Sequence, residues 1–139
     1  MRIIKLSPKD RDMKDRKMVD KYFTKVLFES NPRGQFLLTK GRISEKGISP
    51  GEMIIFSYNV EIVYLALSQS KRLNTIGPDA SHYPYYFCVD TPTIVNGKGT
   101  LYELEQVMNG IKNIVNTQAW PTIKDSAELR KIWVGFMAK

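Results

Sequence analysis

The sequence has little of what most catalytic, metal-binding and membrane proteins need. Its 139 residues include one cysteine, Cys88, and one histidine, His82. A single cysteine cannot form an internal disulfide, and one residue of each kind leaves too few ligands for a tetrahedral zinc site. No stretch approaches the roughly 20 apolar residues of a membrane-spanning helix, and MRIIKLSPKD is too polar for a signal peptide. We therefore expect a folded protein in a reducing, cytoplasmic location.

Catalytic motifs are equally scarce. A Ser-His-Asp or Cys-His arrangement would depend on His82, which we expect to be an exposed loop residue. Cys88 lies in the apolar run YYFCVD, where a buried and unreactive thiol is expected. The segment NGKGT lacks the spacing of a phosphate-binding or dinucleotide-binding loop. The sequence indicates no reaction mechanism, so a non-enzymatic role without cofactor or metal is favoured.

The positive charge is concentrated in the first third of the chain. Residues 1–46 contain 13 Lys or Arg against 6 Asp or Glu, whereas residues 47–139 contain 8 of each kind, so this third carries the whole net charge of +7. A basic face of this kind is typical of a surface that binds nucleic acid. It is also typical of a solvated helix that aids solubility, and charge alone leaves both interpretations open.

The N-terminal part predicts a helix over residues 8–29. RIIKL, before it, is a short strand or a lead-in. Ser7 is the expected N-cap, Pro8 the first helical residue and Asp10 the partner in a capping-box-like spacing. Apolar residues then recur every three or four positions opposite a row of lysines and arginines. ESNPRG ends this helix.

The rest of the chain predicts strands followed by helices. QFLLTK, residues 52–58, residues 60–69 and YYFCVDTPTIV are the expected strands, and the middle two are close enough to be antiparallel. Two helices are expected afterwards, the first with Thr100 as N-cap and Glu103 as its partner. We predict a single α+β domain over residues 1–139, with a small curved antiparallel β-barrel flanked by the N-terminal helix and two C-terminal helices.

A polar and aromatic triplet, Ser57-Tyr58-Asn59, lies between the two middle strands. Tight two-residue turns favour Asn-Gly or Asp-Gly, and Val60 is poorly suited to a positive φ. The triplet is therefore interpreted as the end of a strand. Tyr58 then faces one side and the Ser57/Asn59 pair the other. If the strand stays straight, one or the other lines a site, and not both.

Aromatic residues make up 11% of the chain. Aromatic rings can stack on unpaired bases. Tyr86, Phe87 and Trp133 are expected in the core. For Tyr58, Tyr85 and Trp120, core packing and base stacking both remain open.

The run GISPGEMIIFSYNVEIVYLALSQS resembles the central hairpin of the PUA-like superfamily, within its EVE and YTH-like branch. Gly51-Glu52 matches the entry to the first strand, and Ala66 the small residue of the return strand. YPYYFCVD, TLYELEQVMNGI, TQAWPTI and SAELRKIW follow in a similar order, so the resemblance covers about residues 34–136. The early tryptophan of many EVE domains and the catalytic spacing of ASCH domains are missing.

This resemblance implies a PUA-like or EVE-like domain that binds DNA or RNA, often through a methylated base flipped into an aromatic pocket. By analogy Ser57, Tyr58 and Asn59 would line one side of the pocket, with Trp120 or Tyr85 opposite. Contacts to backbone or base would come from Gln35, Lys40, Arg42, Lys71 and Arg72. Such domains often serve as the reader of a modification-dependent restriction system, alone or beside a nuclease or motor protein.

Two other functions remain open. A small enzyme that processes RNA or a nucleotide could use the same pocket, with His82, Asp79 or Lys40 as the available groups. A protein-interaction or regulatory subunit could instead dock its basic helix on an acidic partner.

Overall fold

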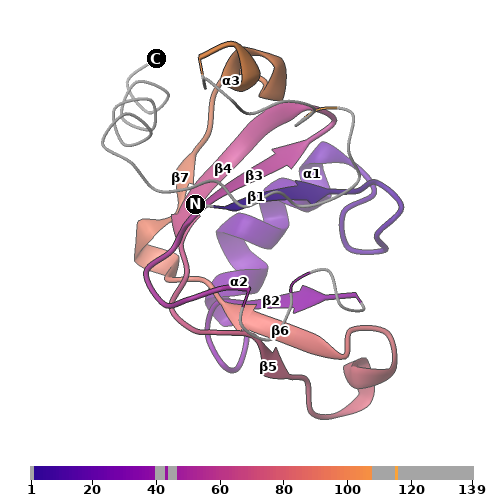
Figure 1. The fold of residues 1–139 in the computed structure, drawn as a ribbon. Helices are drawn as coiled ribbons and strands as arrows, with labels where there is room; N and C mark the ends of the chain where they lie inside the picture. The colour runs from indigo at the N-terminus through magenta and orange to yellow at the C-terminus, as the bar shows by residue number, and fades with distance from the viewer. Residues whose placement is uncertain (1, 40–42, 44–46, 108–114, 116–139) are drawn as a thin grey trace.

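The computed structural model describes residues 2–39, 43, 47–107 and 115, and it shows two β-sheets beside a long helix (Figure 1). In spatial order, the first sheet contains β1 (Arg2–Leu6), β3 (Met53–Tyr58), β4 (Glu61–Leu67) and β7 (Val95–Asn96). The second sheet contains β2 (Gln35–Leu38), β6 (Tyr85–Cys88) and β5 (Leu73–Asn74). Ser68, the residue after β4, forms an isolated bridge with Val89, the residue after β6, and this bridge connects the two sheets.

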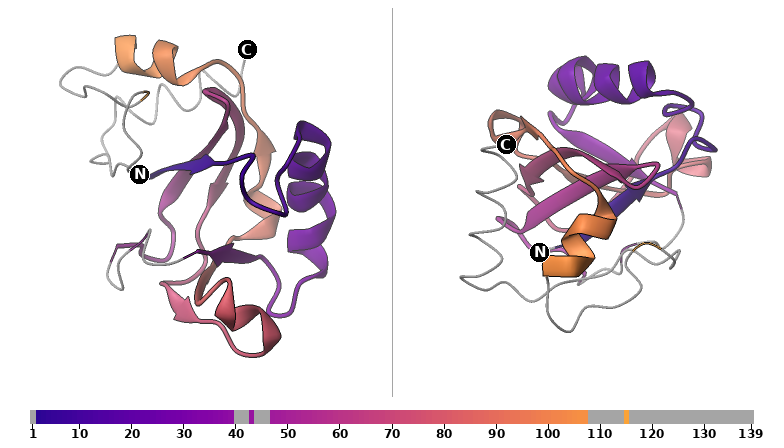
Figure 2. Two further views of the ribbon diagram at one scale, coloured as in Figure 1. Left: turned by 90° about the vertical axis from the view of Figure 1, so that its right-hand side faces the viewer. Right: turned by 90° about the horizontal axis from the view of Figure 1, so that it is seen from above.

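The α+β class is confirmed, but the described strands form two sheets and not the predicted small curved antiparallel β-barrel. β1 pairs with β3 in parallel, from Arg2 opposite Ile54 to Leu6 opposite Tyr58. A parallel pair needs a long crossover, and the chain between β1 and β3 supplies one because it contains the helix and β2. The two sheets are separate hydrogen-bonded ladders of four and three described strands, with the helix along one side (Figure 2).

The N-terminal helix begins later than predicted. It runs through α1 (Arg16–Lys21), a π-helical turn η1 (Tyr22–Val26) and α2 (Leu27–Glu29). Its N-cap is Asp15, whose carboxylate accepts a hydrogen bond from the Met18 amide at 2.9 Å. The predicted start at Pro8, with Ser7 as N-cap, is wrong because residues 7–13 form successive turns. Contacts from distant strands and loops hold those turns, as described below.

Aromatic rings fill the space between the helix and the sheets. Phe23 stacks on Tyr64 with ring centroids 4.5 Å apart and planes 11° apart, and it meets Phe56 edge-on at 4.7 Å. Phe36 connects this group to Phe87, with 5.3 Å between their centroids. We call these five rings the ring core; all are buried. The core role predicted for Phe87 is confirmed. Tyr86 is half-buried, and Trp133 lies outside the described residues.

The hairpin between β3 and β4 closes with a two-residue turn. Asn59 and Val60 have φ values of 49° and 62°, the sign that a tight hairpin turn requires at both positions. The strand ends at Tyr58, as predicted. Val60, however, has a positive φ, although a valine was expected to be poorly suited to one. A register shift between Phe56 and Ser57 bends the strand just before the turn.

Several smaller predictions are confirmed. The strands at QFLLTK and YYFCVD are present as β2 and β6, and Cys88 is a buried free cysteine whose pKa is raised by burial. In α3 (Leu101–Val107), the Thr100 hydroxyl accepts from the Glu103 amide at 3.2 Å. Two 3₁₀ turns, η2 (Pro78–Ser81) and η3 (Thr91–Thr93), complete the elements. The predicted last helix lies outside the described residues. Among the described helices, none is long and apolar enough to cross a membrane.

Candidate nucleic-acid interface

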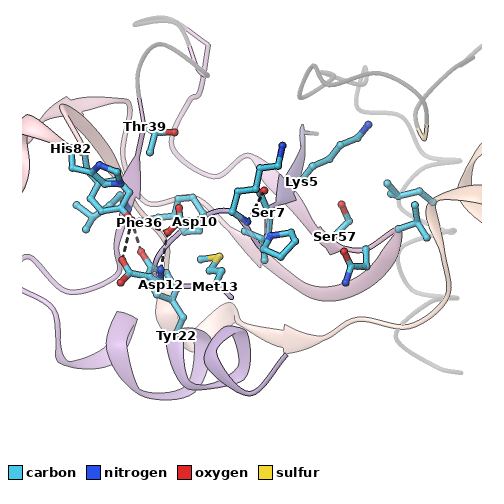
Figure 3. Close-up of a pocket in the computed structure, with 18 of the residues that line it drawn as sticks. Lys5, Ser7, Asp10, Asp12, Met13, Tyr22, Phe36, Thr39, Ser57 and His82 are labelled. Carbon is cyan, nitrogen blue, oxygen red and sulfur yellow. Dashed lines mark hydrogen bonds between the residues drawn. The ribbon is translucent and has the colours of Figure 1, made fainter. Parts of the chain in front are cut away.

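A cavity of about 550 Å³ lies where β1 and β3 end (Figure 3). Because these strands are parallel, their carboxyl ends meet at the same edge of the sheet, as the arrowheads in Figure 1 show. Two loops contribute to the walls. The first is the segment of residues 7–15, which leads from β1 to α1, and the second is the loop of residues 75–84, which joins β5 to β6. The hairpin turn and part of β2 also contribute, together with Tyr22, Leu101 and Val115.

The walls combine apolar, polar and charged side chains. Figure 3 shows Lys5 and Ser57 towards one end of the cavity and His82 at the other. The apolar wall residues include Leu6, Met13, Phe36, Leu37 and Val60. The polar and charged ones include Lys5, Ser7, Lys9, Asp10, Asp12, Thr39, Ser57 and Asn59. A cavity of this composition suits a flat ligand that has both an apolar face and a polar edge.

Tyr83 connects the two loops at the cavity wall. Its hydroxyl donates towards two carboxylates, with Oη 2.7 Å from Oδ1 of Asp10 and 3.1 Å from Oδ2 of Asp12. Burial and the two neighbouring carboxylates raise the pKa of Tyr83 far above its ordinary value, so the hydroxyl keeps its proton. Each carboxylate retains further lone pairs, which makes Asp10 and Asp12 the strongest hydrogen-bond acceptors among the described cavity residues.

Arg11, in the first loop, contacts two residues of the second loop. Its guanidinium donates to Asp79 Oδ1 at 3.0 Å and lies 5.1 Å from the centroid of the Tyr83 ring. His82 is exposed, as predicted, and its ring meets the Tyr83 ring edge-on at 4.5 Å. The two loops are therefore held together by one ion pair and one shared hydroxyl.

The structure separates the members of the predicted Ser57-Tyr58-Asn59 site. Ser57 and Asn59 line the cavity, whereas Tyr58 is 6% exposed and belongs to the core. The Tyr58 hydroxyl donates to the backbone carbonyl of Met13 at 2.9 Å, which holds the segment of residues 7–15 against the sheet. Of the two alternatives, the position of the Ser57/Asn59 pair fits a site, and Tyr58 is not an aromatic wall of this cavity. A nucleic-acid contact by Ser57 or Asn59 stays a prediction.

The other predicted site residues are dispersed. The half-buried ring of Tyr85 packs against the core and is covered by the Arg72 guanidinium, 3.9 Å from its centroid. Neither residue is among those that line the cavity, and neither is the exposed Lys71. Gln35 lines a second hollow, which is described below. The remaining predicted residues, Lys40, Arg42 and Trp120, lie outside the described residues.

Sequence reasoning missed Asp10, Asp12 and Tyr83 as wall residues. The run SPKDRDMKD placed the two aspartates inside a predicted helix, although aspartates spaced two apart are also typical of turns. In the structure the Asp10 carboxylate accepts from the Asp12 amide at 2.9 Å, as in such a turn. Within the described part of the chain, no group of three or more His, Cys, Asp or Glu residues could hold a metal ion.

No protein-family model matches the sequence, and no curated protein matches it either. One solved structure is similar: the YTH domain of the Zygosaccharomyces rouxii MRB1 protein in complex with N6-methyladenosine RNA. The TM-score is 0.58 with 15% identical residues, over 98% of this chain and 86% of the other. The chain therefore has a YTH-like α+β fold. Among the predicted resemblances, the similarity to YTH domains is supported at the level of the fold, and membership of the EVE branch stays a prediction.

Proposed function

We propose that this protein binds nucleic acid and accepts a modified, methylated base in the cavity at the ends of β1 and β3. The observation that carries this proposal is the cavity itself, about 550 Å³ with both apolar and acidic walls. Its volume lies within the roughly 300–1,000 Å³ typical of small-ligand pockets. The YTH domain that shares the fold was solved with N6-methyladenosine RNA, which supports the same class of ligand here.

The wall chemistry favours a base with an exocyclic amino group. Apolar side chains such as Leu6, Met13 and Val60 would contact the face of the base and its methyl group and exclude water. Asp10 or Asp12 would accept a hydrogen bond from the amino group of adenine or cytosine. Uracil and thymine present a carbonyl oxygen at the corresponding position, which a carboxylate repels. We therefore propose a methylated adenine or cytosine as the ligand.

Basic residues beside the cavity support binding of the phosphate backbone. Lys9 is exposed and Lys5 half-buried, and both are wall residues. Burial lowers the pKa of Lys5, although the charge of Glu105 acts in the opposite direction. Phosphate contacts by lysines release counterions, so affinity should fall steeply as the salt concentration rises.

The proposal is tested by measuring the affinity of labelled single-stranded oligonucleotides with and without an N6-methyl group on one adenine. We expect the methylated strand to bind more tightly. Asn59→Gly keeps a residue that accepts the positive φ of the turn but removes the amide from the cavity, and it should weaken methylated binding about tenfold. Asn74→Ala, which changes an exposed amide away from the cavity, is the matched control. Equal affinity of the wild-type protein for both strands would contradict the proposal.

The finer predictions from the resemblance remain proposals. They are a place in a restriction system, a nuclease or motor partner, and a cytoplasmic location. For the alternative of an RNA-processing enzyme, Asp79 is already paired with Arg11, and Lys40 lies outside the described residues. The first experiment on a restriction role is to compare the affinity of the protein for methylated DNA with its affinity for methylated RNA.

A further inference from the structure

A second hollow of about 440 Å³ lies between the N-terminal helix and β2. It is lined by Asp12, Tyr22 and Leu37, and these three residues also line the cavity described above. Figure 3 shows Asp12 and Tyr22 on the side of the cavity that faces the helix. The two hollows are therefore neighbours that share a wall.

Strand β2 forms a common floor beneath both hollows. Phe36 and Leu38 are buried, while Gln35, Leu37 and Thr39 are half-buried, the alternation expected of one strand with two faces. Gln35 and Leu37 line the second hollow, and Leu37 and Thr39 line the cavity. The less buried face of β2 thus leads directly from one hollow to the other.

Tyr22 holds this floor against the helix. Its hydroxyl donates to the Gln35 carbonyl at 3.4 Å and accepts from the Leu37 amide at 3.3 Å. Since Tyr22 is almost fully buried, the position of β2 relative to the helix is well defined. The Gln35 side chain therefore projects from a fixed backbone.

The second hollow has the groups needed to hold a nucleotide. On its helix side are two apolar residues, Met18 and the 39%-exposed Val26, and Leu37 comes from the strand. Two cationic residues, Arg11 and Lys21, also line it, together with Asp79, the ion-pair partner of Arg11. Backbone groups of Gln35 are hydrogen-bonded, but its side-chain amide has no hydrogen-bond partner among the described residues.

We infer that this second hollow binds the nucleotide next to the modified base and that Gln35 reads the edge of its base. The inference rests on the function proposed above and adds a sequence preference to it. An amide presents one donor and one acceptor side by side, which matches N7 and the amino group of adenine. On the edge that carries N7, guanine presents two acceptors, so the amide fits adenine there, and we take adenine as the neighbouring nucleotide. Lys21 contacts the phosphate that joins the two nucleotides.

The test uses single-stranded oligonucleotides that carry one N6-methyladenine and differ only in the base before or after it. For the wild-type protein, adenine on one of the two sides should increase affinity about tenfold over the other bases. Gln35→Ala should remove this preference and keep the preference for the methylated strand. Gln69→Ala, a change to an exposed amide that lines neither hollow, should keep both preferences.

Gln35→Glu provides a second variant of nearly the same shape. The carboxylate has lost the donor that N7 of adenine requires, but it still accepts from the amino group of cytosine, so this variant should transfer the preference from adenine towards cytosine. Lys21→Ala should weaken binding equally for all neighbouring bases and reduce the salt slope by about one, whereas Lys17→Ala on the same helix should change neither.

Two results separate this inference from the proposed function. If methylated strands bind more tightly but every neighbouring base is equivalent, or if Gln35→Ala keeps the adenine preference, the inference is overturned and the proposed function stands. If methylation has no effect on affinity, the proposed function fails and the inference fails with it.

Discussion

The ring core and the rim of the cavity are stabilised in different ways. In the ring core, Phe23 and its neighbours are held mainly by burial of their rings, which is a non-directional source of stability. At the rim, which consists of residues 7–15 and 75–84, a few directed contacts through Tyr83 and Arg11 fix two loops. The stability of the core is therefore spread over many buried contacts, whereas the shape of the cavity depends on single hydrogen bonds.

Phe23→Ala should have the largest effect because it removes the ring at the centre of the core. Phe23 is fully buried and contacts Tyr64, Phe56 and Phe36. We expect the free energy of unfolding to fall by about 3–5 kcal/mol in urea denaturation. Phe28→Ala is the control because that ring is 37% exposed. Similar losses for both variants would mean that the ring core does not dominate stability.

Tyr83→Phe should have an intermediate effect confined to the rim. The change removes the hydroxyl that Asp10 and Asp12 share, and a hydrogen bond to a charged group contributes about 1.5–3 kcal/mol. We expect a loss of about 2 kcal/mol and faster hydrogen exchange at the amides of residues 10–13.

Tyr58→Phe is the matched control for Tyr83→Phe because it removes the hydroxyl that binds the same segment through the neutral carbonyl of Met13. That variant should lose only about 1 kcal/mol. An equal or larger loss in Tyr58→Phe would show that the paired carboxylates contribute nothing special to the rim.

Sequence patterns predicted the core better than the rim because the core follows local periodicity. Alternating apolar residues identified β3 and β4, and the side chains of Ile54 and Phe56 are indeed fully buried. The barrel was wrong because periodicity does not report which strands pair. The parallel partnership of β1 and β3 depends on packing of the long crossover between them.

The rim was not predictable because distant residues override a strong local signal. SPKD has the pattern of a helix start, yet Tyr58 and Tyr83 are 45 and 73 residues away from their partners Met13 and Asp10. These contacts stabilise turns where propensity favours a helix.

Val60 is a similar case. A β-branched residue at φ 62° costs free energy locally, and Val60 is a wall residue of the cavity. Of the predicted site residues, Ser57 and Asn59 reach the cavity because Asn59 is part of the same hairpin turn and Ser57 lies just before it.

The smallest expected effect concerns Tyr64, where the ring core has a polar contact. Its hydroxyl donates to Asp20 Oδ1 at 2.7 Å, and burial together with this bond raises the pKa of Tyr64 from 10.0 to about 12. A raised pKa in the folded protein means that the neutral hydroxyl stabilises the fold below pH 10 and that this contribution is lost as pH rises towards 12. Tyr64→Phe keeps the ring stack, and the half-exposed Asp20 carboxylate remains paired with Arg16, so the stability of this variant should be only about 1 kcal/mol below the wild type at neutral pH. The difference should shrink between pH 10 and 12, as followed by denaturation at each pH.

Tyr102→Phe, with a 54%-exposed side chain, should differ from the wild type at no pH. A difference for Tyr64→Phe that stays constant through this range would show that the hydroxyl is not coupled to folding, and the ring core would then be held by its apolar contacts alone.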